Sequence, residues 1–490
     1  MKTENPLKTE NPLKSEAPLS PDDRYGRLRD LLAAGAGVLL VTVAVLVGRA
    51  IQHANGSLRV QWPPLLASWD PHVGPGTPAA VVVAVAVIAY GPVLAARLPW
   101  RGLLLTAWTA SLAWTLSLAL IDGWERGVAR RLTTKHEYLR VIDRFDDIGA
   151  ALRGFDDHIL IGPPGNWPAH VAGHPPGATL TFVGLDRIGL GGGAWAALWC
   201  LLLAVSASVA VLITLRALGD EHLARRAAPF LVLAPVAVWA GVSADGYFAA
   251  VAAWSVTFLA LAATRRGCRG AMAGGATGGG AKGIWAPALV SGLLFGLTCY
   301  LSYGLTLIAV LLLAVLALAR TARPLVPFLL GASVVPLAFT LAGFNWWDAY
   351  HLLVERYYQG AGGVRPYGYW VWANLACTTL AAGLATVAGL RRALSAAPGA
   401  VRTLRPGSGT GRDPADAAQR LGLLALAALL ALLVADLSGM SKAETERIWQ
   451  PFVLWLLPAA ALLPDTARRG WLTAQAVVAL LVNHLLWTGW

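Results

Sequence analysis

The sequence predicts an all-α protein that crosses a membrane many times, because hydrophobic content is high, charge is low and long segments are apolar. Of the 490 residues, 56% are hydrophobic and only 13% are charged, and the mean hydropathy is +0.57. Soluble domains carry about 25% charged residues, whereas a membrane-spanning helix needs about 20 apolar residues. The composition therefore excludes an ordinary soluble enzyme and predicts a polytopic integral membrane protein.

Apolar segments that are long enough, or nearly long enough, to span a membrane recur along the whole chain. In chain order they cover residues 31–51, 79–97, 103–121, 194–215, 228–242, 247–264, 284–300, 303–319, 325–343, 370–390, 421–438, 448–463 and 471–488. Several are short, so one or two could be tilted or re-entrant. The sequence predicts about 12–13 transmembrane helices.

Three segments have the composition of flexible chain. Residues 1–30 are polar and contain the sequence TENPLK twice, which predicts a disordered tail ahead of a membrane domain at 31–490. Residues 265–283 are rich in Gly, and residues 392–419 are rich in Gly, Pro and Arg, which predicts two flexible loops. Neither loop contains a Walker A motif, which argues against an ATP-driven pump.

The distribution of Lys and Arg predicts the orientation of the chain. The net charge is +12, from 39 Lys and Arg against 27 Asp and Glu, and no nucleic-acid-binding motif accounts for it. Short cytoplasmic loops of membrane proteins are enriched in Lys and Arg. A cytoplasmic N-terminus puts most short Arg-bearing loops on the cytoplasmic side. We therefore expect a multi-pass plasma-membrane protein with a cytoplasmic N-terminus, cytoplasmic loops at 265–283 and 392–419, and no nucleic-acid partner.

The loop at residues 122–190, on the extracytoplasmic side, is the longest and the richest in titratable groups. A loop that only connects two spans could be much shorter, so its length indicates a functional site. Within it, segments 123–140 and 177–190 are expected to form helices that lie on the membrane surface.

Asp122 is the strongest candidate for a catalytic residue. It follows the apolar segment 103–121 at the membrane boundary, where a carboxylate is unfavourable unless it is paired or used. Glu125 lies nearby and is expected to line the same pocket. The alternative is an ordinary solvated helix end in which Asp122 pairs with Arg126.

Two groups of residues have some features of a metal site, but a structural interpretation fits each better. Asp146 and Asp147 are weak candidates for a divalent cation, and interleaved arginines favour a solvated acidic surface. His170 and His174 have the i, i+4 spacing of zinc ligands on a helix, but Gly173 and two following prolines disfavour a helix. We therefore expect His174 to face the pocket from a rigid turn, with no metal required.

Asp245 lies in the short turn Ser243-Ala-Asp-Gly246, between two predicted spans and on the same side as the large loop. One interpretation is that it caps the following helix. The other is that it lines the pocket.

The segment Ser441-Lys-Ala-Glu-Thr-Glu-Arg447 is a charged cluster at the extracytoplasmic start of a predicted span. Arg447 is well placed to bind an anionic lipid phosphate, because a guanidinium offers paired N–H donors to phosphate oxygens. Lys442 is a second candidate phosphate ligand. The alternative is a basic and aromatic membrane anchor.

The extracytoplasmic segment 344–368 is a second predicted wall of the pocket. Arg356 is a further candidate for binding the phosphate, and His351 and Tyr357 are candidates for lining the pocket. The alternative is a belt of interfacial aromatic residues.

The order of these motifs resembles that of the GT-C glycosyltransferases, and most closely the polyprenyl-phosphate-sugar enzymes: aminoarabinose transferases, protein O-mannosyltransferases and arabinosyltransferases. His174-Pro-Pro-Gly177 is followed by an interfacial helix, a span, a basic turn and then Ser243-Ala-Asp-Gly246. Asp122 matches the catalytic aspartate at the start of the first large loop of that family. Glu444-Thr-Glu-Arg447 resembles its basic motif near the lipid phosphate. The resemblance covers residues 103–343 and 440–463.

The resemblance implies an inverting glycosyltransferase whose donor is a polyprenyl-phosphate-linked sugar and whose acceptor is a glycan, lipid or protein of the cell envelope. Asp122 would take the proton from the acceptor hydroxyl. Arg447, with Lys442 or Arg356, would stabilise the departing phosphate. The pocket would be lined by Glu125, His174, Asp245, His351 and Tyr357. No cofactor is required, and a divalent cation is compatible with this scheme without being needed.

Two other classes of protein remain open. A transporter or lipid flippase would carry charged residues deep in its spans and two similar halves, whereas the sequence shows few such charged residues and no clear repeat. A non-catalytic membrane partner would bind the lipid-linked sugar through a disrupted site. In such a protein Asp122, His174, Asp245 and Arg447 would not converge on one cavity.

Overall fold

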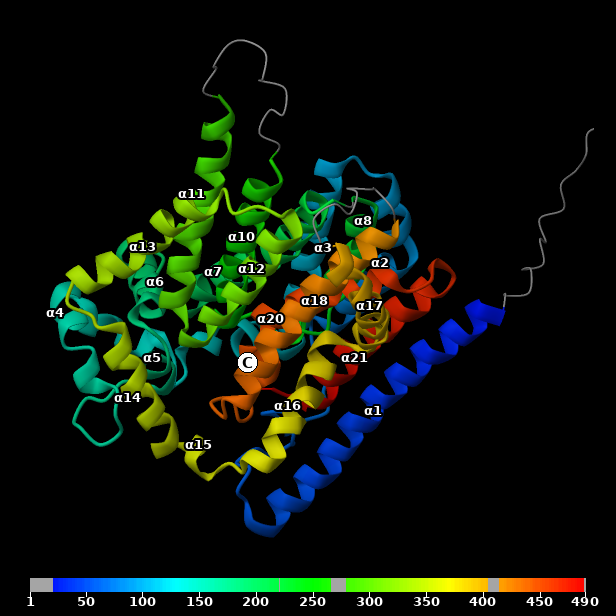
Figure 1. Cartoon of the computed structure of the whole chain (residues 1–490). Helices are drawn as coiled ribbons and strands as arrows, with labels where there is room; N and C mark the ends of the chain where they lie inside the picture. The colour runs from blue at the N-terminus through cyan, green and yellow to red at the C-terminus, as the bar shows by residue number, and fades with distance from the viewer. Residues whose placement is uncertain (1–20, 220, 266–278, 404–413, 489–490) are drawn as a thin grey trace, which may run out of the picture.

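The fold is built almost entirely from helices (Figure 1). The computed structural model describes residues 21–219, 221–265, 279–403 and 414–488. Among these residues, seven helices are long and apolar enough to cross a membrane. They are α1 (Pro21–Asn55), α2 (Thr77–Arg97), α3 (Trp100–Ala119), α7 (Gly193–Ala217), α10 (Ala244–Thr264), α11 (Gly279–Leu301) and α18 (Pro414–Leu437). The prediction of an all-α multi-pass membrane protein is confirmed.

By length and composition, fewer segments of the described chain qualify as spans than the about 12–13 predicted, because several predicted spans are bent or short. Two bent helix pairs raise the number among the described residues to nine if each pair is one span. These pairs are α13 (Leu325–Leu341) with α14 (Trp346–Gln359), bent by 78°, and α16 (Tyr367–Ala382) with α17 (Leu384–Thr403), bent by 107°. The second bend falls at Gly383, whose φ of 80° suits glycine. The predicted span 370–390 is therefore not one straight helix.

Four other predicted spans form shorter or less apolar elements. They contain α8 (Glu221–Val232) with α9 (Ala237–Ala240), η6 (Tyr303–Leu307) with α12 (Ile308–Ala319), α20 (Gln450–Leu456) with η7 (Leu457–Leu462), and α21 (Arg468–Leu485). Residues of α20 and η7 are buried by neighbouring helices. Because protein surrounds these two elements, they do not need the length of a helix that faces lipid.

Parts of the three segments predicted to be flexible are helical in the structure. Residues 21–30 of the predicted tail belong to α1, and the ends of the two predicted flexible loops belong to α11, α17 and α18. Residues 1–20, 266–278 and 404–413 lie outside the described residues.

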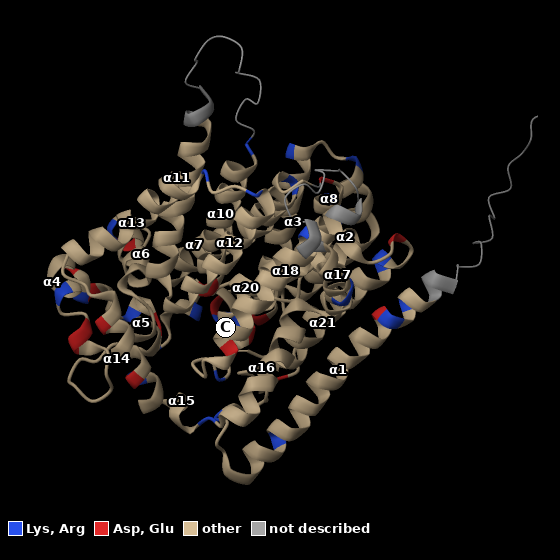
Figure 2. Ribbon diagram, viewed as in Figure 1, with Lys and Arg blue, Asp and Glu red and all other residues tan. Residues whose placement is uncertain are grey.

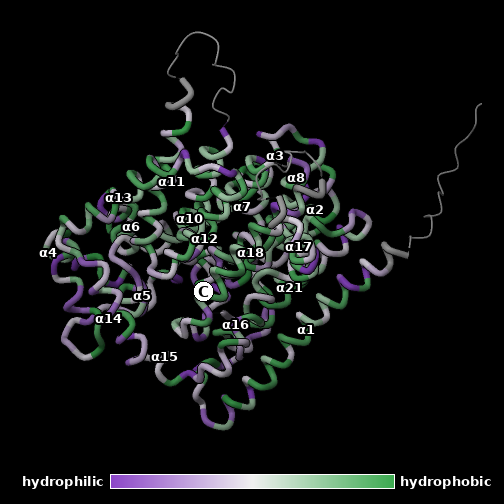
Figure 3. The backbone as a smooth tube through the Cα atoms, in the orientation of Figure 1, coloured by the Kyte–Doolittle hydropathy of each residue, from purple (hydrophilic) through white to green (hydrophobic). Residues whose placement is uncertain are grey.

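Close packing of helices forms the core. α10 packs against both α7 and α11, and α11 packs along α13. Gly292 permits this approach, because a Cβ there would lie 1.9 Å from the carbonyl oxygen of Phe328. Helix α1 instead runs along the edge of the bundle beside α16 and α17 (Figure 1). Its middle is hydrophobic (Figure 3), and Leu39 and Leu46 are exposed, as expected of a helix that faces lipid.

The large loop is a series of short helical turns. They are η1 (Leu120–Asp122), η2 (Glu125–Ala129), η3 (Arg131–Thr133), η4 (Tyr138–Phe145), α4 (Ile148–Arg153), η5 (Asp156–His158), α5 (Ala169–Gly173) and α6 (Pro176–Arg187). Helix α6 confirms the helix predicted at 177–190. The continuous helix predicted at 123–140 is wrong, because η2 is π-helical and η3 and η4 are 3-10 helices. Val128 and Leu132 are nevertheless buried.

A two-stranded antiparallel sheet joins distant parts of the chain. β1 (Ser68–Trp69) follows α1, and β2 (Leu486–Trp487) follows α21. The remaining short elements are α15 (Ala361–Val364), α19 (Thr445–Ile448) and η8 (Asp465–Ala467). Gly76 donates a backbone hydrogen bond to Leu120 at 3.0 Å, so the chain between β1 and α2 lies against the end of α3.

Candidate functional site

The candidate site lies at one end of the helix bundle, which we call the site end, where α3 ends and α10 begins. The large loop folds over these helix ends, and α19 reaches them from the C-terminal part of the chain. Acidic residues gather around α4 and α14 and beside α20 (Figure 2). The site end therefore combines buried helix termini with a concentration of charged groups.

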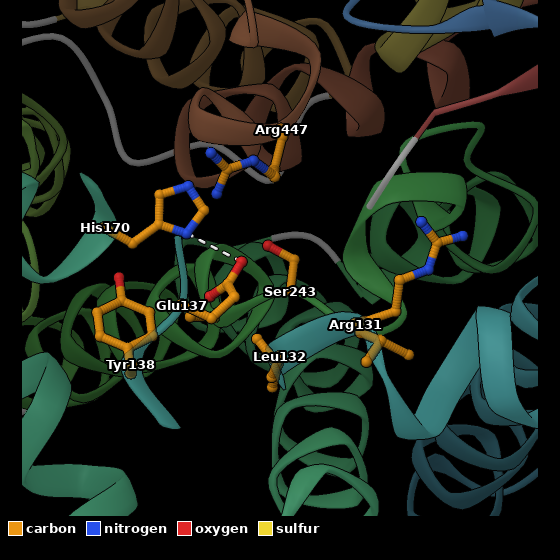
Figure 4. A pocket seen from close by; sticks show the side chains of 9 residues that line it. Arg131, Leu132, Glu137, Tyr138, His170, Ser243 and Arg447 are labelled. Atoms are coloured by element: carbon orange, nitrogen blue, oxygen red, sulfur yellow. Dashed lines mark ion pairs between the residues drawn. The ribbon is translucent and has the colours of Figure 1, made fainter. Parts of the chain in front are cut away.

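A pocket at the site end is lined by four separate parts of the chain (Figure 4). Its lining residues are Arg131, Leu132, Glu137, Tyr138, His170, Val242, Ser243, Ala244 and Arg447. About 250 Å³ of space beside these residues is free of protein atoms, and part of that space is open to solvent. Two guanidinium groups thus share a small pocket with a carboxylate, an imidazole, a phenol and a hydroxyl group. Guanidinium groups bind phosphate oxygens, and the other groups can hydrogen-bond to hydroxyl groups.

Arg447 and Asp245 form a buried ion pair, although 202 residues separate them in the sequence. Ser243 caps α10, because its hydroxyl group accepts a hydrogen bond from the backbone N–H of Asp245 at 3.1 Å. The Asp245 side chain is directed toward Arg447. Arg447 also lies 3.0 Å from Glu444. Burial alone would lower the pKa of Arg447, but the carboxylates of Asp245 and Glu444 together raise it by more than this. The guanidinium therefore stays charged.

Asp122 is surrounded by three basic side chains. One of its carboxylate oxygens lies 2.7 Å from Arg131. The other lies 3.2 Å from His72 and 3.5 Å from Arg126. Asp122 does not itself line the pocket, but it contacts Arg131, which does. Burial lowers the pKa of Arg131, and the charge of Asp122 opposes this effect.

A tight turn brings Asp122 and Arg131 together. The chain reverses at Gly123, where φ is 78°, and then forms η2 against the end of α3. Gly127 packs so closely that a Cβ there would lie 1.9 Å from the carbonyl oxygen of Ala119. This contact holds the following turn over α3, so Arg131 reaches back to Asp122.

Glu137 and His170 form a pair on the pocket wall. The Nδ1 atom of His170 lies 2.9 Å from Oε1 of Glu137. The ring of Tyr138 lies 6.1 Å from the ring of His170 and 6.0 Å from that of His174. Burial raises the pKa of Tyr138 well above its ordinary value, so its phenol is a neutral hydrogen-bonding group.

His174 lies behind Tyr138, in the turn that precedes α6. Its Nδ1 atom is 3.0 Å from the carbonyl oxygen of Leu301. Burial lowers the pKa of His174 to about 4, although Asp245 opposes this shift. The imidazole is therefore neutral at physiological pH and contacts the pocket through Tyr138.

Lys442 and Tyr357 hold the segment that leads to Arg447. The Nζ of Lys442 donates to the carbonyl oxygen of Gly362 at 2.8 Å. Its backbone N–H donates to the hydroxyl oxygen of Tyr357 at 3.0 Å. Burial raises the pKa of Tyr357 to about 12. Neither side chain is among the residues that line the pocket.

Arg356, His351 and Glu125 lie away from the pocket lining. Arg356 donates to the backbone carbonyls of Ile159 and Trp167, the second at 2.8 Å. This pair of bonds ties α14 to the large loop. His351 and Glu125 are exposed, and Glu125 lies 3.1 Å from Arg130.

The weak candidates for metal binding have structural contacts. Asp147 caps α4 by accepting a hydrogen bond from Ala150 at 2.9 Å, and the backbone carbonyl of Asp146 accepts one from Arg187 at 2.8 Å. His170 and His174 make separate contacts, as described above. Within the described residues, no group of three or more His, Cys, Asp and Glu side chains is arranged to hold a metal ion.

Sequence reasoning did not single out Arg131, Glu137 or His72 as site residues. Arg131 and Glu137 lie in the segment that was expected to form a regular surface helix, which gave no reason to select either. His72 reaches Asp122 only because β1 and β2 fix its segment. Each of the four residues expected to converge is nonetheless at the pocket or contacts its lining: Arg447 lines it, Asp245 binds Arg447, Asp122 binds Arg131, and His174 packs on Tyr138.

The fold and the site define a multi-pass, α-helical membrane protein with a charged pocket at one end of its helix bundle. No family model and no curated protein matches the chain. Its structure is similar to that of ArnT from Cupriavidus metallidurans in the apo state, at 15% identity and a TM-score of 0.42, over 73% of this chain and 60% of that one.

A second similar structure is the Archaeoglobus fulgidus oligosaccharyltransferase in complex with Zn and sulfate. The identity is 14% and the TM-score is 0.41, over 78% of this chain and 52% of that one. The chain thus matches less than two thirds of the length of either protein.

Proposed function

We propose that this protein is a membrane glycosyltransferase that moves a sugar from a polyprenyl-phosphate donor to an acceptor in the cell envelope. One observation carries the proposal: Arg131 and Arg447 line a single pocket, and each is paired with an aspartate outside the lining, Asp122 and Asp245. Such a pocket combines cations for a phosphate leaving group with carboxylates for proton transfer. The resemblance of the sequence motifs to GT-C enzymes supports the same reaction class.

The donor phosphate binds between Arg131 and Arg447 in this proposal. Both arginines are among the residues that line the pocket, and they reach it from segments far apart in the sequence. Negative charge grows on the phosphate as its bond to the anomeric carbon breaks, and fixed cations stabilise that charge most strongly in a site with little water. Lys442 supports this geometry by holding the chain that carries Arg447.

Asp122 is the proposed base. In the resting structure it is bound to Arg131, and the singly charged phosphodiester of an arriving donor competes for the same guanidinium. Once Arg131 turns toward the phosphate, Asp122 can accept the proton of the acceptor hydroxyl as its oxygen attacks the anomeric carbon. The sugar is then transferred with inversion and the polyprenyl phosphate leaves. No cofactor takes part in this scheme.

We further propose that the site end faces the extracytoplasmic side of the plasma membrane. At the opposite end of the bundle, Arg225, Arg226 and Arg420 donate to backbone carbonyls near the ends of helical elements. Arg391 and Arg392 bind the Asp30 carboxylate of α1 there. Enrichment of arginine on one side favours a cytoplasmic location for that side. The acceptor would then be a glycan, a lipid or a protein outside the cytoplasm.

The test is transfer of labelled sugar from polyprenyl-phosphate donors in membranes that contain the protein, compared with membranes that lack it. Asp122→Asn should reduce transfer about 100-fold or more, because it removes the base. Asp143→Asn is the matched control, since Asp143 is an exposed carboxylate of the same loop. Its transfer rate should remain within about twofold of the wild type.

Two outcomes would contradict this proposal. If the wild type transfers no sugar from any donor but binds polyprenyl-phosphate sugar through Arg447, the protein is a non-catalytic binding partner. If Asp122→Asn transfers sugar at the normal rate and protein level, Asp122 is not the base.

A further inference from the structure

We propose that Glu137, oriented by His170, binds a hydroxyl group of the transferred sugar and so helps to determine which donor the site accepts. This inference rests on the proposed function, because it assigns the sugar to the same pocket. The juxtaposition that supports it is a buried carboxylate beside two arginines that would hold the donor phosphate.

Glu137 has one carboxylate oxygen with a partner and one without. The side chain of Glu137 is 3% exposed, and Oε1 lies 2.9 Å from Nδ1 of His170. Oε2 is buried and accepts no hydrogen bond from the part of the chain that the structure describes. A buried acceptor without a donor is unfavourable. A ligand that donates a hydrogen bond to Oε2 would remove this penalty.

The backbone around this pair is fixed before any ligand arrives. The backbone N–H of His170 donates to the carbonyl oxygen of His136 at 3.0 Å. The backbone N–H of Glu137 donates to the carbonyl oxygen of Thr134 at 3.1 Å. The ring of Tyr138 packs near that of His170. Two segments of the large loop are therefore joined at Glu137, and its carboxylate is held in one orientation.

The position of Glu137 suits the sugar rather than the phosphate. In Figure 4 it lies between His170 and Ser243, with Arg447 beyond them and Arg131 to the other side. A phosphate bound by the two arginines places its attached sugar ring within this same small pocket. A carboxylate repels the phosphate but accepts hydrogen bonds from neutral hydroxyl groups.

The chemistry of the pocket also disfavours a metal ion as the missing partner of Oε2. Arg131, Arg447 and His170 already bring basic groups to the lining. No metal-ligand cluster of three or more His, Cys, Asp and Glu residues exists within the described ranges. A hydroxyl group adds no charge and needs only the one acceptor that Glu137 offers.

The first test compares binding of two lipids to purified protein in nanodiscs: polyprenyl-phosphate sugar and polyprenyl phosphate without a sugar. Glu137→Gln should weaken binding of the first lipid about 10-fold or more, because the substituted amide presents N–H groups where a hydroxyl donor is expected. Binding of the second lipid should change less than about twofold. Glu355→Gln is the matched control, since Glu355 is an exposed glutamate on α14, and it should bind both lipids as the wild type does.

The second test uses donors that each lack one sugar hydroxyl. One deoxy donor should bind the wild type about 10-fold more weakly than the full sugar, and Glu137→Gln should weaken that donor no further. His170→Asn, whose amide can replace the Nδ1–H donor, should retain sugar binding, whereas His170→Ala should lose it. Thermal unfolding of each variant verifies that it is folded.

Equal effects of Glu137→Gln on both lipids, or no effect on either, would overturn this inference. So would a transfer rate that falls about 100-fold while the affinity for the donor stays unchanged, since Glu137 would then be a proton acceptor. These binding measurements do not need turnover. A protein that binds sugar through Glu137 but never transfers it would refute the proposed function and leave this inference standing.

Discussion

The guanidinium of Arg131 lies 2.7 Å from the carboxylate of Asp122, and the two side chains are only 7% and 6% exposed. This pair links the end of α3 to the pocket, because Arg131 lines the pocket and Asp122 does not. Any anion that draws Arg131 into the pocket also changes the surroundings of Asp122. In the proposed reaction, binding of the donor and release of the base would therefore be coupled through one side chain.

The destabilising effects of Arg131→Gln and Asp122→Asn, measured separately and added, should exceed the effect of the double substitution. Arg131→Gln leaves Asp122 with only His72 and Arg126 nearby, and Asp122→Asn leaves a buried guanidinium without its carboxylate. A double-mutant cycle should therefore give a coupling energy of about 1–3 kcal/mol. Thermal unfolding in detergent measures it, and additive effects of the two substitutions would contradict the pairing.

The pair formed by Arg447 and Asp245 should be important for stability as well as for phosphate binding. Asp245→Ala leaves Arg447 with Glu444 as its remaining carboxylate partner, so the loss should be at most about 3–5 kcal/mol, the cost of an uncompensated buried charge. Asp465→Ala is a matched control, because Asp465 pairs with Arg226 and Arg468 but is 64% exposed. It should change stability by about 0–1 kcal/mol. Equal losses in the two variants, measured by urea or thermal unfolding, would argue against the buried pair.

Gly127→Ala should disturb the site without removing any charged group. A Cβ at this position would lie 1.9 Å from a backbone oxygen of α3, so the turn that carries Arg131 must shift. We expect lower stability and donor binding weakened about 10-fold, as is typical when a charged contact worth about 1.4 kcal/mol is lost. Gly184→Ala in α6 is the control, since a Cβ there meets nothing within 4 Å. Unchanged donor binding by Gly127→Ala would show that the turn tolerates a side chain.

The stability of the protein should fall in mildly acidic solution because of His174. Burial lowers the pKa of His174 to about 4, below its ordinary value of 6.5. The unfolded chain therefore binds a proton more readily, so this contribution is present above pH 6.5 and is lost as the pH falls toward 4. At pH 5 the loss reaches about 2 kcal/mol at most.

A substitution can separate His174 from other titrating groups. His174→Asn keeps a side-chain N–H donor for the Leu301 carbonyl but cannot be protonated. The difference in melting temperature between pH 7.5 and pH 5 should be smaller in this variant than in the wild type. An unchanged difference would mean that other residues cause the acid sensitivity.

The sequence predicts the long spans well because their apolar composition is a local property. Segments such as 31–51 and 194–215 need no information from the rest of the chain to be recognised. It predicts the bent and buried elements poorly. α20, for example, is short and is covered by neighbouring helices. The sequence of α20 alone does not reveal which helices these are.

The same distinction between local and long-range information explains which site residues the sequence could predict. Asp122, Asp245 and Arg447 are conspicuous in the sequence because each lies where a hydrophobic segment begins or ends. Arg131 and Glu137 are polar residues in a polar loop, and only the folded turns show that they are buried. The pairing of residues 202 positions apart depends on how the helices pack, which no local pattern specifies.

The strand pair β1–β2 has a consequence for how the protein is made. Asp70 and His72 follow β1 and donate backbone hydrogen bonds to Leu485 and His484 at 3.1 and 2.8 Å, and His72 then reaches Asp122. Translation must therefore proceed to the last turn of α21 before the surroundings of Asp122 are complete. A nascent chain with every earlier helix inserted would still lack the backbone partners that position His72 beside Asp122.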